Sequence, residues 1–149
     1  MEAVIFIGVQ ATGKSEFYRQ RFFRSHVRVN LDMLKTRHRE RLLVAACVEA
    51  RQPFVIDNTN PSVADRQRYI AESKGAGFAV VGYYFRSSVH EALERNRRRS
   101  GPDRVPDRGV LGTYARLELP SRDEGFDQLH FVSIGDDGGF VVETYDESR

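Results

Sequence analysis

The sequence predicts an α/β protein with three layers, in which helices cover both faces of a mostly parallel, five-stranded sheet. Two observations support this fold class. Short β-branched runs alternate along the 149 residues with segments of helical composition, as in strands joined by crossover helices. A glycine-rich loop lies between the first strand and the first helix, at the edge where parallel sheets receive their ligands. With no evident repeat or linker, we expect one domain over residues 1–149.

The first part of the chain contains three expected strands and three expected helices. Residues 2–7 are apolar and end at a glycine, which predicts a strand buried on both faces. Further along, Asn60 and Pro61 form a helix start signal, an N-cap residue followed by proline, and Gly75 marks the helix end. The expected strands are 2–7, 27–31 and 54–56, and the expected helices are 15–24, 35–51 and 61–74.

The second part continues the alternation and closes on a hairpin. The expected strands are 78–85, 128–134 and 140–144, and the expected helices are 89–97 and 110–119. The last two strands flank a Gly-Asp-Asp-Gly-Gly turn, so we expect an antiparallel edge strand there. Residues 95–106 are rich in arginine and interrupted by Gly and Pro, which sets them apart from the regular elements.

Composition narrows the class of protein without naming a ligand. A single cysteine, Cys47, excludes an internal disulfide framework and any cluster of cysteine metal ligands, which is typical of a reducing compartment. No apolar run approaches the roughly 18 residues of a membrane span, so we expect a soluble, cytoplasmic protein. Residues 118–149 hold nine acids against two bases, whereas residues 1–117 hold 21 bases against 12 acids. The basic part favours polyanionic ligands such as phosphates or nucleic acid.

The glycine-rich loop carries the most specific signal. Gly8-Val-Gln-Ala-Thr-Gly-Lys-Ser15 matches the Walker A pattern and lies between an expected strand and an expected helix. Its backbone N–H groups form a nest for phosphates, Lys14 reaches the β and γ phosphates, and the Ser15 hydroxyl can bind Mg²⁺. The residues expected to bind ATP are Gly8, Ala11, Thr12, Gly13, Lys14, Ser15 and Glu16.

Size and missing motifs separate this loop from other Walker A proteins. A GTPase normally carries D-x-x-G and N-K-x-D segments, whereas here the strand at 54–56 runs into Asp57-Asn58-Thr59-Asn60. A motor or recombinase ATPase would need a longer chain. A small phosphotransferase therefore fits best, and a non-catalytic nucleotide- or RNA-binding module stays open as an alternative.

Two carboxylates follow expected strands at the edge that the loop faces. Asp32 follows the second strand and is the candidate that orients or deprotonates an acceptor hydroxyl. Asp57 follows the third strand, expected beside the first, and could hold Mg²⁺ through water or position Asp32 and Ser15. The plainer alternatives are a helix-capping role for Asp32 and, for Asp57 with Asn58, a role in organising the turn.

The arginine-rich segment is the third candidate feature. Five arginines lie between Arg95 and Arg104, beside Gly and Pro. Such a segment suits a mobile lid over about 95–106 that closes on ATP and neutralises charge on the transferring phosphoryl group. The alternative is a solvated helix end whose arginines complement the helix dipole.

Together these segments resemble the kinase domain of 5′-hydroxyl polynucleotide kinases over roughly residues 4–132. The segments that carry the resemblance are 8–15, 30–32, 54–61 with 65–66, 84–85 with 94–97, and 124–126. The resemblance implies a P-loop NTPase fold with the kinase-type strand order second, third, first, fourth, fifth. It also implies that Asp32 is the general base, that the Asp57 segment with Asn58 and Asn60 supports the substrate site, and that Arg99, or else Arg95, contacts the donor phosphates.

One departure from the family concerns the acceptor. Members often have arginine three residues after the base, where this sequence has Lys35, and lysine cannot make the same bidentate contact with a phosphate. A small-metabolite or antibiotic kinase therefore stays open as an alternative to a kinase acting on the 5′-hydroxyl of DNA or RNA. No phosphatase or ligase module accompanies the kinase motifs, so we expect a standalone enzyme or one with repair or ligase partners.

Overall fold

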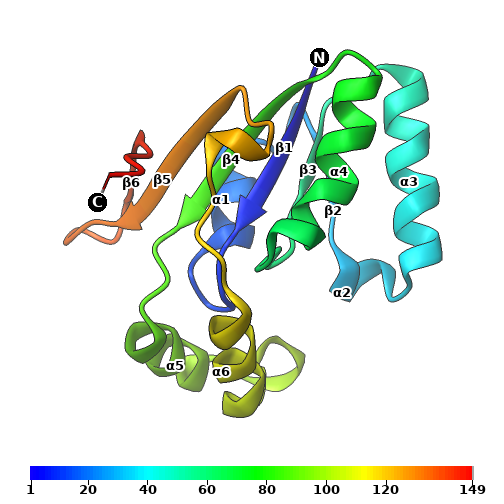
Figure 1. Cartoon of the computed structure of the whole chain (residues 1–149). Coiled ribbons are helices and arrows are strands. Elements are labelled where there is room, and N and C mark those ends of the chain that lie inside the picture. The colour runs from blue at the N-terminus through cyan, green and yellow to red at the C-terminus, as the bar shows by residue number, and fades with distance from the viewer. Residues whose placement is uncertain (149) are drawn as a thin grey trace.

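The computed structural model describes residues 1–148 and contains one six-stranded sheet (Figure 1). The strands are β1 (Glu2–Ile7), β2 (Val27–Val29), β3 (Phe54–Ile56), β4 (Ala79–Phe85), β5 (Gln128–Ile134) and β6 (Phe140–Thr144). The helices are α1 (Lys14–Arg21), α2 (Leu31–Leu34), α3 (Arg37–Ala50), α4 (Val63–Gly75), α5 (Val89–Arg98) and α6 (Asp107–Arg116), with 3₁₀ turns η1 (Gly101–Asp103) and η2 (Arg122–Glu124).

The strand order is β2-β3-β1-β4-β5-β6, which confirms the expected order of the first five strands. β1 pairs in parallel with both β3 and β4, β2 pairs in parallel with β3, and β5 with β4. Only β6 runs antiparallel, along β5, as the expected edge strand. The carboxyl ends of β1, β2 and β3 therefore meet at one edge of the sheet, where the loops that follow them lie together.

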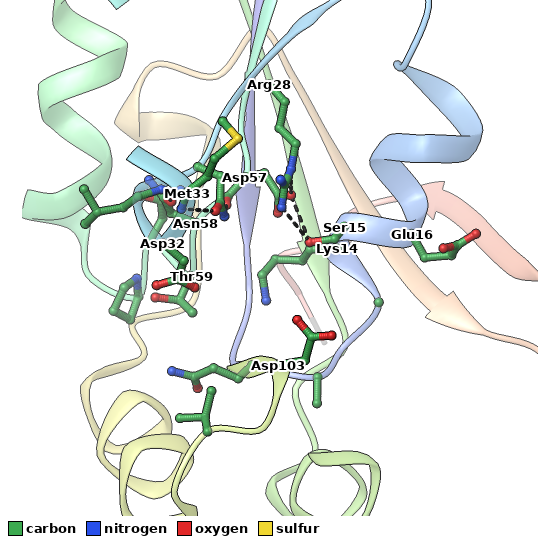
Figure 2. Close-up of a pocket in the computed structure, with 18 of the residues that line it drawn as sticks. Lys14, Ser15, Glu16, Arg28, Asp32, Met33, Asp57, Asn58, Thr59 and Asp103 are labelled. Carbon is green, nitrogen blue, oxygen red and sulfur yellow. Dashed lines mark hydrogen bonds and ion pairs between the residues drawn. The ribbon is translucent and has the colours of Figure 1, made fainter. Parts of the chain in front are cut away.

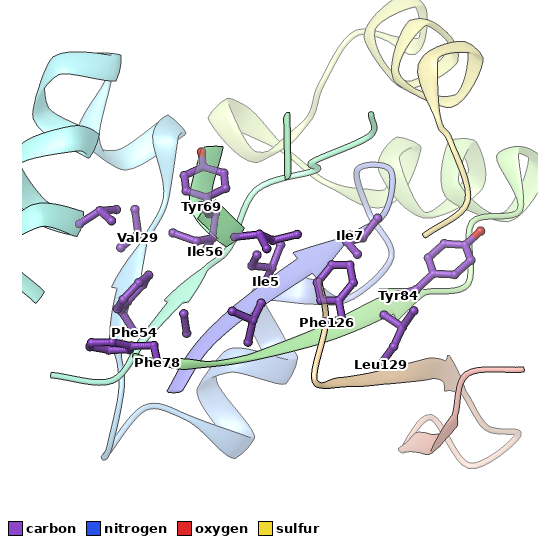
Figure 3. Packing of buried hydrophobic residues seen from close by; sticks show 14 of the residues in the cluster. Ile5, Ile7, Val29, Phe54, Ile56, Tyr69, Phe78, Tyr84, Phe126 and Leu129 are labelled. Atoms are coloured by element: carbon purple, nitrogen blue, oxygen red, sulfur yellow. The ribbon is translucent and has the colours of Figure 1, made fainter. Parts of the chain in front are cut away.

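Alternation along the strands sends side chains into two apolar layers. Ile5 and Ile56 join one core under α3 and α4, shown in Figure 3, together with Cys47 from α3. Phe6 and Val55 join the other core, against Phe17 and its neighbours on α1. Because β1 is completely buried on both faces from its second residue, the prediction made for it is confirmed. The glycine-rich loop thus starts from a strand that is buried on both faces.

Helices α5 and α6 lie beyond the sheet edge rather than on either face (Figure 1). They share a small apolar cluster of Val9, Ala92 and Val110, which connects them to the start of the glycine-rich loop. Between them, the buried Asn96 side chain exchanges two hydrogen bonds with the backbone of Val105. Residues 95–106 therefore comprise the end of α5, η1 and a return segment without regular structure, held at its base by Asn96.

The predicted start of α4 was wrong. The helix begins two residues later, with Ser62 as N-cap, and Ser62 and Asp65 form a reciprocal capping box. Asn60 cannot act as the cap because it has a left-handed φ of 44° and donates its side-chain amide to the carbonyl of Phe6.

Two other boundaries differ from expectation. The helix expected at 110–119 begins three residues earlier, directly after Pro106, and ends at Arg116. The second strand stops at Val29, and Asn30 instead caps the short helix α2, accepting from the N–H of Met33. Asp32 therefore lies in the first turn of a helix rather than at the end of a strand. No helix within residues 1–148 has the length and apolar character needed to cross a membrane.

Candidate active site

A cleft of about 950 Å³ opens at the carboxyl edge of the sheet (Figure 2). It is bounded by the glycine-rich loop, α2, the loop after β3 and the segment that follows α5. The cleft brings together most of the residues predicted from the sequence, including Lys14, Ser15, Glu16, Asp32, Lys35, Asp57, Asn58, Asn60 and Arg99. Arg95 is on α5 and is not among the residues that line the cleft.

The backbone of the glycine-rich loop has the conformation of an anion nest. Ala11 and Gly13 both have left-handed φ angles, 63° and 94°, which turn successive N–H groups toward one side. A side chain at Gly13 would meet the ring of Phe140 at 2.9 Å, so both backbone and packing require glycine there. The first residue of the loop is fixed as well, because the N–H of Gly8 donates to the carbonyl of Thr59.

Lys14 folds back onto this loop. Its ammonium donates to the carbonyls of Gly8 at 2.9 Å and Val9 at 2.6 Å, and lies 3.3 Å from the hydroxyl of Thr12. Burial lowers the pKa of Lys14 to about 8, with Asp57 raising it and Arg99 lowering it further. The loop thus holds a buried cation where the phosphates of a nucleotide would lie.

Ser15 and Asp57 are joined by a third residue that sequence reasoning missed. The Ser15 hydroxyl donates to Asp57 Oδ2 at 3.1 Å. Arg28 Nε donates to the same carboxylate oxygen at 2.8 Å, and Arg28 Nη2 donates to Ser15 Oγ at 3.0 Å. Asp57 is only 2% exposed, so this guanidinium balances a buried negative charge.

The donor set at this point fits Mg²⁺. One carboxylate and one hydroxyl on neighbouring elements are the hard oxygen ligands that Mg²⁺ takes from proteins when phosphates and water complete its shell. Within residues 1–148 no three His, Cys, Asp or Glu side chains cluster as an all-protein metal site. Ser15 and Asp57 would therefore hold the ion together with nucleotide phosphates.

Two asparagines fasten α2 to the end of β3. Asn30 Nδ2 donates to the carbonyl of Asp57 at 2.7 Å, and Asn58 Oδ1 accepts from the N–H of Leu31 at 2.8 Å. Asp32, the next residue, is exposed at the cleft. It is close enough to Lys14 to raise the pKa of that ammonium. The helix that carries Asp32 is thus tied by hydrogen bonds to Asp57 and Asn58, the residues that follow β3.

A buried polar network supports Asn58 from behind. Its amide Nδ2 donates to Glu40, which is 2% exposed and also accepts from Tyr69 and Arg37. Burial raises the pKa of Tyr69 to about 12, so its hydroxyl stays protonated as a donor. Glu40 lies in the first turn of α3 and carried no sequence signal beyond helical composition. Asn58 is therefore a positioning residue in this structure.

The segments around Arg66 and Glu124, which also carried the family resemblance, hold the fold together. Arg66 is fully buried and makes a bidentate ion pair with Glu124, with its Nε 2.7 Å from Glu124 Oε1. It also donates to the carbonyls of Asn60 and Pro61. The side chain of Asn60 is itself bonded to β1, so its predicted substrate contact stays a prediction.

The lid arginines differ from one another in place. Arg97 and Arg98 are exposed and paired with Asp107 and Glu94. Arg99 lines the cleft, contacts the carbonyl of Asp103 and acts on Lys14 electrostatically. Of the two predicted lid arginines, Arg99 is therefore the one beside the glycine-rich loop. Four further basic residues that line the cleft had not been singled out, namely Arg19, Arg28, Arg37 and Arg116.

A signal for Arg28 was present in the sequence. It alternates with Val27 and Val29 on an expected strand, so its side chain had to face one side of the sheet. That strand neighbours the one ending in Asp57. An arginine on a strand of a buried sheet needs an acidic partner, and Asp57 was the nearest acid expected at that edge.

Comparisons with known proteins agree with this geometry. A family model described as an AAA domain matches residues 4–120. The chain belongs to the AAA domain family. The bifunctional polynucleotide phosphatase/kinase of Schizosaccharomyces pombe is 27% identical in an alignment of 138 residues that covers 88% of this chain. The chain spans only 33% of that relative's length.

Two solved structures share the fold of this AAA domain. Kti12 of Chaetomium thermophilum, in complex with ADP-AlF3, has a TM-score of 0.68 at 18% identity and covers 91% of this chain and 90% of its own. A gluconokinase from Sinorhizobium meliloti has a TM-score of 0.63 at 20% identity, covering 91% and 83%. The fold is that of P-loop kinases, and a nucleotide-binding, kinase-type function is supported without a determined substrate.

Proposed function

We propose that this AAA domain is a Mg²⁺- and ATP-dependent kinase that phosphorylates the 5′-hydroxyl end of a nucleic acid. One observation carries the proposal. Asp32 faces the same cleft as the glycine-rich loop and is held there by Asn30 and Asn58, so a carboxylate lies across from the expected γ-phosphate. The polynucleotide phosphatase/kinase relative supports the choice of acceptor.

The reaction follows from these positions. The loop N–H groups and Lys14 hold the β and γ phosphates of ATP. Asp32 accepts the proton of the acceptor hydroxyl while that oxygen forms a bond to the γ-phosphorus. The bond from this phosphorus to the bridging oxygen breaks, and ADP leaves with that electron pair. Mg²⁺, held by Ser15 and Asp57, would neutralise charge on the phosphates.

Arg99 completes the charge balance on the donor side. The transferring phosphoryl group carries charge on three equatorial oxygens, and a guanidinium in a water-poor site stabilises it. Arg99 already lines the cleft, so a modest closure of residues 95–106 would bring it to the phosphates. Its exposure agrees with a residue that acts on closure.

The acceptor side of the cleft is basic. Seven bases and five acids line the whole cleft, and Lys35 and Arg37 lie next to Asp32 along the chain. Lys35 is exposed and ends α2 with a φ of 75°, which turns the chain toward Arg37. A polyanionic end with a phosphate behind its terminal sugar fits such a rim. Cytoplasmic location and repair or ligase partners remain part of this proposal.

The test is transfer of labelled γ-phosphate from ATP to an oligonucleotide with a 5′-hydroxyl. The matched control is the same oligonucleotide with a 5′-phosphate, offered as DNA and as RNA. We expect label on the 5′-hydroxyl form alone. Because this sequence has Lys35 where the family often has arginine, the same assay is also run with a panel of small metabolites that includes gluconate. Label on a metabolite instead would replace the acceptor, and nucleotide binding without any transfer would contradict a kinase.

A further inference from the structure

Arg28 engages both side chains that are expected to hold Mg²⁺. Its Nε lies 2.8 Å from Asp57 Oδ2, and its Nη2 lies 3.0 Å from Ser15 Oγ (Figure 2). The Ser15 hydroxyl donates to the same Asp57 oxygen. The three groups form a closed triangle in which one guanidinium bridges a carboxylate and a hydroxyl.

This arrangement competes with metal binding. A carboxylate oxygen has about two lone-pair positions, and Asp57 Oδ2 already accepts from Arg28 and Ser15. A divalent cation at that oxygen would also repel the guanidinium at close range. Mg²⁺ and the Arg28 guanidinium therefore compete for this carboxylate oxygen.

The triangle has a reason to exist without metal. Asp57 is 2% exposed, and an unpaired buried carboxylate is costly. Arg28 comes from β2, the edge strand; its side chain is 29% exposed and lines the cleft. Its guanidinium therefore borders the cleft into which it would be released.

We propose that Arg28 is a displaceable counter-ion which holds Ser15 and Asp57 closed until Mg²⁺ arrives together with a nucleotide. A metal ion alone gains only two protein ligands by displacing Arg28. A metal–nucleotide complex adds phosphate oxygens to the metal and an anionic partner for the released guanidinium. The inference rests on the proposed function only in taking Mg²⁺ and a nucleotide as the ligands of this site.

The test measures Mn²⁺ binding to nucleotide-free protein by electron paramagnetic resonance. We expect Arg28→Ala to bind Mn²⁺ at least about tenfold more tightly than the wild type, because hydrogen bonds to charged groups no longer compete. Adding Asp57→Asn to Arg28→Ala should remove that gain. The matched control is Arg19→Ala, which removes one positive charge that lines the same cleft but pairs with Glu16. Its Mn²⁺ affinity should stay near that of the wild type.

A second measurement uses ADP. Arg28 competes with the metal only while no ADP is bound. ADP should therefore strengthen Mn²⁺ binding by a larger factor in the wild type than in Arg28→Ala. Arg28→Gln keeps a neutral donor for Asp57 and should show the same gain in Mn²⁺ affinity if Arg28→Ala does not fold. Equal or weaker Mn²⁺ binding by the folded variant would overturn the proposal. No acceptor or transfer enters either measurement, so failure of the kinase assay and failure of this inference are separate results.

Discussion

In the proposed mechanism, the glycine-rich loop and the arginine segment of residues 95–106 act on the same phosphates in opposite ways. In the loop, Ala11, Thr12 and Lys14 are all buried, and the chain is held by the central strand. In residues 95–106, the side chains of Arg97 to Arg99 are exposed, and a small apolar cluster with Asn96 fixes only the base. The loop is therefore preorganised, whereas in the proposed mechanism the segment would supply its charge by closing on the cleft. A change in the loop should affect binding and transfer, and a change in the segment mainly transfer.

The loop should give the largest effect. Lys14→Ala removes the only side-chain cation that the loop itself holds. We expect transfer to fall to background, on the order of 10⁴-fold or more, with weaker ADP binding as well. Lys14→Met keeps the apolar stem and should behave the same way in calorimetry and transfer assays. Retained transfer in both variants would show that Lys14 is not required for phosphoryl transfer, and the proposed role of the loop would be wrong.

Asp32 should separate binding from chemistry. It is exposed at the cleft and belongs to α2 rather than to the loop, so Asp32→Asn leaves every expected phosphate contact in place. We expect near-normal ADP affinity and a loss of transfer of about 10² to 10⁴, the usual worth of a positioned base. Asp57→Asn should instead weaken Mg²⁺-dependent ADP binding too. Near-normal transfer by Asp32→Asn would remove it from the mechanism.

Arg99 tests the other side of the comparison. Because it is expected to reach the phosphates only on closure, Arg99→Ala should lower kcat by about 10²-fold and change ATP affinity much less. Arg98→Ala is the control, since Arg98 is exposed on the same segment and pairs with Glu94. Similar kinetics for the two variants, measured at saturating acceptor, would show that Arg99 has no special place in the lid.

These regions also differ in what the sequence could predict. Walker A is a local pattern whose backbone geometry follows from its own residues, so the loop and its neighbouring strands were expected in place. Asp32 was expected at the correct edge but on the wrong element, because the tie from Asn58 to Leu31 joins segments 27 residues apart. Glu40 and Arg37 acquire their roles only through such contacts, whereas the alternation of Arg28 with Val27 and Val29 left a signal in the sequence. Long-range pairing of polar side chains has no periodicity that a single sequence reveals.

The start of α4 shows the same limit at the level of one residue. Asn60 before Pro61 is a sound local signal for a helix start. The structure instead uses the Asn60 amide to satisfy a carbonyl of β1, and the cap passes to Ser62. Tertiary demand for a buried hydrogen bond thus overrides local preference.

The smallest predicted effect is a dependence of ADP affinity on pH, which connects Lys14 in the glycine-rich loop with Arg99 in residues 95–106. Burial lowers the pKa of Lys14 to about 8, and anionic phosphates should raise it again when a nucleotide binds. Below pH 8 the ammonium is protonated in both states, so ADP affinity is level. Above pH 8 binding takes up a proton, and ADP affinity should fall by up to about tenfold per pH unit. Calorimetry in two buffers of different ionisation enthalpy at pH 9 would show the proton uptake directly.

Two variants make this pH dependence specific. Lys14→Arg stays charged throughout and should abolish the fall in affinity. Arg99 lowers the pKa of Lys14, so Arg99→Ala should move the onset of the fall to higher pH while Arg98→Ala leaves it unchanged. The size of that shift in pH measures the electrostatic effect of Arg99 on the pKa of Lys14 before residues 95–106 close. A level profile from pH 7 to 9.5 in the wild type would mean that Lys14 keeps an ordinary pKa, and that the loop stores no buried cation for the lid to act on.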